Sequence, residues 1–126
     1  MLSLVITPEE VKSGVMSTEH RKAAANAILE DGVVVLENVV DLKHVTILRD
    51  KMIADIDALL ARPDRPFNWN SGNLQQTPPP VPPYLFEDVL LNDMAIAVTH
   101  EILGNGVQND FYSGNTAIKS EQRQPV

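Results

Sequence analysis

Apolar side chains recur at intervals of three and four residues between Leu42 and Leu60, the clearest pattern in the chain. This spacing places them on one face of an α-helix. Asp41 is positioned to cap the start, and Arg62-Pro63 ends the helix because the residue before a proline disfavours helical geometry. We expect a long amphipathic helix through residue 60. Its apolar stripe comprises Leu42, Val45, Leu48, Met52, Ile53, Ile56, Leu59 and Leu60.

Capping residues and glycines that mark helix ends predict two shorter helices before this one. The segment Thr7–Glu10 reads Thr-Pro-Glu-Glu, in which the threonine can cap, the proline suits the first helical position and the second glutamate completes a capping box. Gly14 makes that helix brief. Ser17 offers a second cap, and residues 18–30 are helical by composition. Gly32 ends this helix, because glycine tolerates the left-handed conformation.

The remaining elements are three candidate strands and one late helix. Leu2–Ile6 is a short apolar stretch, and the β-branched run in Val33–Leu36 predicts a strand buried on both faces. A helix capped by Asn92, or by the aspartate after it, runs through Leu103. A strand with mixed faces is expected from Gln108 to Ala117. Helices followed by late strands favour an α+β fold, and the length favours one domain over residues 1–126.

Residues 63–83 form a long connection that is rich in proline, asparagine and glutamine. Loops of this length are usually functional or disordered. One interpretation is a surface linker in which Pro78–Pro83 adopts extended polyproline II geometry. The alternative is a loop folded over a substrate pocket, which Phe67 and Trp69 favour because linkers rarely carry large aromatic side chains.

The amino-acid composition indicates which classes of partner the protein does not bind and in which compartment it is located. Ten basic residues oppose seventeen acidic ones, for a net charge of −7. Such a chain repels phosphate backbones and anionic lipids, so we expect binding neither to nucleic acid nor to membranes. There is no cysteine, no apolar run long enough to span a membrane and no signal-peptide start. We therefore expect a soluble, cytoplasmic protein.

Motifs for common catalytic chemistry are absent from the sequence. His20, His44 and His100 fall on three different predicted helices, and none is part of a His-x-Asp pair. There is no nucleophile elbow and no phosphate-binding glycine loop. We expect neither catalytic residues nor metal ligands in this chain.

Three segments, taken in order, resemble a known family. Asp31–Val40 reads DGVVVLENVV and precedes the long amphipathic helix, Asn68–Pro79 is rich in amides before its prolines, and Gln122–Val126 closes the sequence. Over residues 20–126 they are similar to the phytanoyl-CoA dioxygenase family, and more closely to its members in fungal secondary metabolism. These proteins are non-haem oxygenases that use Fe(II) and 2-oxoglutarate.

The resemblance implies the fold and the cofactors. It predicts an N-terminal helical layer plus the first strands of a double-stranded β-helix, a jelly-roll or cupin-like fold that is incomplete in this chain. The family binds iron with two histidines and one carboxylate. Its His-x-Asp motif would begin at residue 127, and the second histidine would follow later. We therefore expect that this chain alone does not hold Fe(II) and 2-oxoglutarate tightly and does not catalyse the turnover of 2-oxoglutarate.

The resemblance also implies pocket residues. Gln124 matches a glutamine that hydrogen-bonds 2-oxoglutarate, with a polar side chain at an exposed strand end as the alternative. Asn70, Asn73 and Gln76 match a region that lines the substrate or cosubstrate pocket, although asparagine is also common in simple turns. Asn115 lies on the strand that enters the site.

Three functional hypotheses follow from the sequence. The first is the N-terminal part of an oxygenase that oxidises an apolar small molecule, a secondary-metabolite intermediate. The second is a non-catalytic module that pairs with a second copy, with the missing C-terminal half or with a homologue through open sheet edges. The third is a small α+β domain whose proline-rich loop is a peptide-like ligand.

Overall fold

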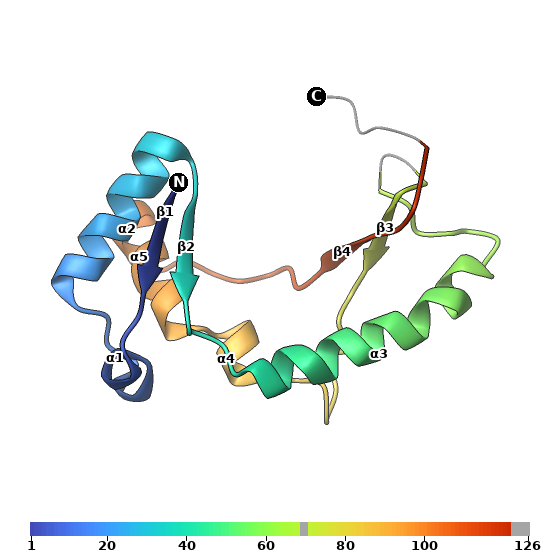
Figure 1. Ribbon diagram of the computed structural model, residues 1–126, viewed down its shortest axis with the longest axis horizontal. Helices are drawn as coiled ribbons and strands as arrows, with labels where there is room; N and C mark the ends of the chain where they lie inside the picture. Colours follow the sequence, from blue (N-terminus) through green and yellow to red (C-terminus); the bar gives the residue numbers. More distant parts are fainter. Residues whose placement is uncertain (69–70, 122–126) are drawn as a thin grey trace. The chain divides into compact units, whose positions relative to one another are not determined.

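The computed structural model describes residues 1–68 and 71–121, and these divide into two compact units (Figure 1). One unit contains residues 1–42 and 86–109, and the other contains residues 43–85 and those from 110 onward. The elements, in chain order, are β1 (Leu2–Val5), α1 (Pro8–Ser13), α2 (Thr18–Asp31), β2 (Val34–Glu37), α3 (Leu42–Leu60), β3 (Asn73–Gln76), α4 (Glu87–Leu90), α5 (Asp93–Leu103) and β4 (Gly114–Ala117).

The fold is a mixture of helices and small open sheets, which confirms the α+β class. Among the described residues there are two sheets, a parallel pair β1–β2 and an antiparallel pair β3–β4. The jelly-roll assignment and the single domain over residues 1–126 stay predictions. None of the helices in the described part of the chain is long and apolar enough to cross a membrane.

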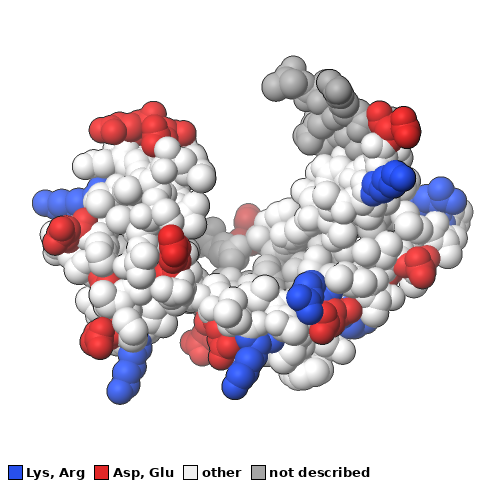
Figure 2. All heavy atoms as spheres, in the orientation of Figure 1, with Lys and Arg blue, Asp and Glu red and all other residues white. Residues whose placement is uncertain are grey.

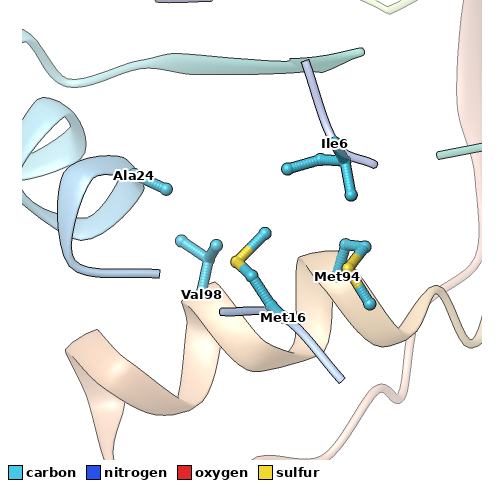
Figure 3. Close-up of a cluster of buried hydrophobic side chains, with 5 residues drawn as sticks. All are labelled: Ile6, Met16, Ala24, Met94 and Val98. Carbon is cyan, nitrogen blue, oxygen red and sulfur yellow. The ribbon is translucent and has the colours of Figure 1, made fainter. Parts of the chain in front are cut away.

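The first unit packs the β1–β2 pair and two helices around a small aliphatic core. Pairing of Leu2 with Val34 and of Leu4 with Leu36 sets the parallel register, and Leu4, Val34 and Leu36 pack against the buried cluster. That cluster joins α2, α5 and the chain that follows β1, as Figure 3 shows. Its members are Ile6, Met16, Ala24, Met94 and Val98.

One expectation for this sheet is wrong. The strand within Val33–Leu36 is not buried on both faces, because burial alternates along β2. Val34 and Leu36 face the core, whereas Val33 and Val35 are exposed. A β-branched run therefore predicted the strand itself but not the coverage of its second face.

The predicted helix ends of this unit are confirmed. Thr7 and Glu10 form a full capping box, and Ser17 accepts a hydrogen bond from the His20 amide. Gly32 ends α2 in the left-handed conformation. Gly14, also left-handed, is crowded, since a Cβ there would lie 2.8 Å from Asp93 Oδ2.

Asn92 connects the segment that follows β2 to helices α4 and α5. Its side-chain oxygen accepts the Ala95 amide at 3.0 Å and so caps α5, as predicted. Its Nδ2 donates to the carbonyls of Val39 and Asp88, at 2.7 and 2.8 Å. The sequence did not predict the short helix α4 that carries Asp88.

The second unit is built on α3 and the β3–β4 pair. Helix α3 ends at Leu60 as predicted, but its apolar stripe is unevenly covered: Leu48 is buried, whereas Ile53 is 58% exposed. Strand β3 lies inside the segment that we interpreted as a loop. The strand expected from Gln108 to Ala117 is too long: only Gly114–Ala117 forms a strand, β4, where β3 supplies a hydrogen-bonding partner.

Buried Glu10 joins the starts of α1 and α2. Its carboxylate accepts the Thr7 amide at 3.1 Å and the Ser17 amide at 2.7 Å, and it lies 3.0 Å from His20 Nδ1. Hydrogen bonds from the backbone of Ser17 and Thr7 lower the pKa of Glu10 to about 2. Since ordered N–H donors stabilise the carboxylate, the folded state holds this proton more weakly than the unfolded chain does.

We predict that acid unfolding of this protein depends on Glu10. Because its folded pKa lies below the unfolded value of 4.5, its stabilisation is complete above pH 4.5 and is lost as the pH falls towards 2. Melting temperatures measured by circular dichroism across this range should fall less in Glu10→Gln than in the wild type. Glu9→Gln, at an exposed position in the same turn, should retain the wild-type slope. Equal slopes in the wild type and Glu10→Gln would contradict the assignment.

Candidate functional site

Strand β3 lies in the middle of three extended segments. On one side it pairs antiparallel with β4, with Gln75 opposite Asn115 and Leu74 opposite Thr116. On the other side it meets residues 66–68 through a bridge between Phe67 and Leu74. The Asn68 amide donates to the Asn73 carbonyl and the Gln75 amide to the Pro66 carbonyl, both at 2.7 Å. Strand β3, which lies within the amide-rich segment, is therefore paired along both of its edges.

The register decides which amide side chains share a face. Successive side chains along a strand point to opposite faces, so Asn73 and Gln75 lie on one face of β3. Their partner residues on β4 are Ala117 and Asn115, which places Asn115 on the same face. Asn68 Nδ2 donates to Asn115 Oδ1 at 3.4 Å across the central strand. We call this surface the amide face: Asn68, Asn73, Gln75 and Asn115.

Gln76 lies on the opposite face and is 4% exposed. Its Nε2 donates to the Met52 carbonyl on α3 at 2.7 Å, and its Oε1 accepts from Thr116 Oγ1 at 2.7 Å. Both ends of this amide are thus engaged inside the protein. Since a buried amide must keep its partners, the geometry gives Gln76 the role of fastening β3 to α3 and β4.

The structure therefore brings together some of the predicted pocket residues. Asn73 and Asn115 share the amide face, while Gln76 is turned away from them. Asn70 and Gln124 lie outside the described residues. Sequence reasoning did not single out Asn68 and Gln75 as site residues, although both belong to the amide-rich segment, because only the strand register shows which amides share a face.

The three histidines do not form a metal centre. Within residues 1–68 and 71–121, no group of three or more histidine, aspartate or glutamate side chains is arranged to hold a metal ion. His20 contacts Glu10, while His44 and His100 lie on α3 and α5. The described residues thus do not fit the two-histidine, one-carboxylate site of iron oxygenases. We assign no chemical step through iron to them.

A cavity of about 480 Å³ lies between the end of α3 and the end of β3. Polar groups of Asp55, Arg62 and residues 75–77 line it beside the apolar Ala58, Leu59 and Pro66. Basic and acidic side chains are interspersed on the face shown in Figure 2, and near this cavity they form close pairs. The cavity size is in the range of sites for small ligands.

No family model matches the chain.

We predict that Gln76 is needed for stability and its neighbour Gln75 is not. Gln76→Leu leaves the Thr116 hydroxyl and the Met52 carbonyl without this amide and should lower the free energy of unfolding by about 1–3 kcal/mol. The matched change Gln75→Leu, at an exposed position on the same strand, should alter it by less than about 0.5 kcal/mol. Urea unfolding followed by circular dichroism measures both. Equal effects of the two substitutions would contradict the role of Gln76.

Proposed function

We propose that this chain supplies one wall of a non-haem Fe(II)/2-oxoglutarate oxygenase that resembles the phytanoyl-CoA dioxygenase family. The observation that supports this most directly is the pairing of β3 with β4. It sets the amide-rich segment, which carries part of the resemblance, beside the strand that leads to Gln122–Val126. One of the three similar segments thus contributes a strand to the sheet that contains β4.

In this proposal the two units are the helical layer and the first strands of a jelly-roll. Each described sheet has only two named strands, and such small sheets gain stability when further strands or helices cover them. The additional strands of the β-helix would pair with these open edges. They would come from sequence beyond residue 126 or from another chain.

The amide face is the proposed contact with an apolar small molecule, a secondary-metabolite intermediate. Asn73 and Asn115 would hydrogen-bond the polar group of that substrate, and Asn70 would extend the contact. Gln124 would hydrogen-bond 2-oxoglutarate. The iron ligands would come from outside this chain, as the resemblance implies.

We predict no turnover by the 126-residue chain alone. With Fe(II), ascorbate and 2-oxoglutarate added, succinate release should equal that of the protein-free control, because the resemblance places the iron ligands after residue 126. Succinate production by the pure chain would refute the prediction.

A longer chain provides the positive test. The coding sequence after codon 126 should encode His-x-Asp at once, and the extended protein should release succinate in an iron-dependent way. In that protein Asn115→Leu should raise the substrate KM more than it lowers kcat, whereas Asn105→Leu, in the turn after α5, should change neither. A downstream sequence without His-x-Asp removes the oxygenase proposal.

The alternative is a non-catalytic partner or dimerisation module. The observation that favours it is the apolar stripe of α3, on which Val45 and Ile53 are exposed. Exposed apolar patches often mark interfaces between proteins. In this alternative, the partner that covers the surface is a second copy of the chain.

This alternative predicts a dimer in light scattering at high protein concentration. Ile53→Lys should convert it to a monomer, because a charge would then be buried in the interface, while Asp50→Lys on the exposed side of α3 should not. A monomer at every concentration counts against the alternative and leaves the oxygenase proposal standing.

A further inference from the structure

Two helices of the first unit are followed closely by a glycine that comes directly after an acidic or amide side chain. These dipeptides are Asp31-Gly32 at the end of α2 and Asn105-Gly106 after α5. In such a pair the backbone nitrogen of the glycine can attack the carbonyl carbon of the preceding side chain, since glycine has no Cβ that blocks the approach. The attack is intramolecular, which favours it strongly over the same reaction between separate molecules. Its rate depends on whether the glycine nitrogen is free.

The two helices use their glycines differently. In α2 the glycine of the dipeptide is itself the C-cap, and the Gly32 amide donates to the Ile28 carbonyl at 2.9 Å. Helix α5 instead takes Gly104 as its C-cap, which leaves the Asn105-Gly106 pair beyond the helix. Among the described residues, no backbone carbonyl accepts a hydrogen bond from the Gly106 amide. The nitrogen of Gly32 is therefore held in the helix end, whereas no carbonyl of the described backbone holds that of Gly106.

The surroundings of this second pair leave room for the chain to rearrange and for water to enter. Asn105 and Gly106 are both exposed. Gly106 has a φ of 89°, in the left-handed region, and a Cβ built there would meet no atom within 4 Å. Asn109 is also exposed, but its Nδ2 donates to the Leu90 carbonyl at 3.5 Å, and the larger Asp110 follows it. Exposure, free space and a following glycine thus occur together at Asn105.

We infer that Asn105 is a modification site, at which the chain converts its own asparagine into aspartate and isoaspartate. The Gly106 nitrogen loses its proton and bonds to Cγ of Asn105, and the carboxamide nitrogen leaves with that proton as ammonia. Water then adds to one of the two carbonyl carbons of the succinimide ring and opens it. Opening on one side gives aspartate, and opening on the other gives isoaspartate, in which the backbone runs through the side chain. Water is consumed and ammonia is released, so the step needs no oxidant, reductant or metal.

The modification changes both the charge and the path of the chain at this point. It adds a negative charge to a protein whose net charge is already −7. Asn105 borders a cavity of about 390 Å³ that Arg21, His100 and Glu101 also line, and Arg21 Nε lies 2.8 Å from Glu101 Oε2. The new carboxylate therefore arises at a cavity that already holds an ion pair. The isoaspartate form also lengthens the backbone between α5 and β4 by a carbon atom.

Incubation of the whole folded chain in H₂¹⁸O, over days at mildly alkaline pH, tests the inference. Digestion in ordinary water with a glutamate-specific protease then yields a peptide of residues 102–121, which carries Asn105, Asn109 and Asn115 together. Mass spectrometry should show that Asn105 loses its amide nitrogen and takes up ¹⁸O several-fold faster than the other two asparagines. The product should be a mixture of aspartate and isoaspartate. Asp31 should take up no ¹⁸O over the same time, because the nitrogen of the following glycine is held.

Substitutions separate the chemistry from folding. Gly106→Ala places a Cβ next to the attacking nitrogen and should slow the conversion several-fold. Asn105→Gln leaves the backbone unchanged and should abolish the conversion over the same time, because a larger ring must close, while Asn109→Gln should leave the rate at Asn105 unchanged. An intact Asn105, equal rates at Asn105 and Asn109, or an unchanged rate in Gly106→Ala would each overturn the inference. Because no iron or 2-oxoglutarate is added, these failures are independent of the oxygenase proposal.

Discussion

The pairing of β3 with β4 is the constraint on which the candidate site depends. These strands lie about forty residues apart in the chain, and their antiparallel register determines where every amide points. Gln76 stabilises this pairing, because its buried side chain hydrogen-bonds to the Met52 carbonyl on α3 and to the Thr116 hydroxyl on β4. A shift of one residue would exchange the two faces of β3, bury Gln75 in place of Gln76 and dissolve the amide face.

The same pairing separates two roles that look identical in the sequence. Gln75 and Gln76 are adjacent amides, but Gln75 is exposed on the amide face while Gln76 is buried and holds the sheet together. The amide face and the cavity therefore share an origin in one strand without sharing their chemistry. The first offers several amides on one face of the sheet. The second is lined by the charged Asp55 and Arg62 and by the apolar Ala58, Leu59 and Pro66 beside the end of β3.

Local signals predicted much of the first unit. The Thr7–Glu10 capping box, the Ser17 cap and the glycine after α2 act within a few residues, so the sequence contains the full physical cause. The α+β class followed from the same elements. Strand β3 could not be found in this way, because Asn-Leu-Gln-Gln has little intrinsic strand preference and is ordered by partners remote in the chain. The roles of Gln75 and Gln76 depend on that register. They could not be predicted from the sequence, because the register is set by partners that are remote in the chain.

The chain path through the two units has a consequence for how the protein can be made and dissected. Each unit is discontinuous: the chain leaves the first after residue 42, returns to it at residue 86 and leaves it again after residue 109. A ribosome therefore releases β3 long before its partner β4 exists, and β3 lacks that partner while α4 and α5 are synthesised. No single contiguous fragment contains the whole of either unit without part of the other, so isolating one of them requires rejoining the chain in a new order.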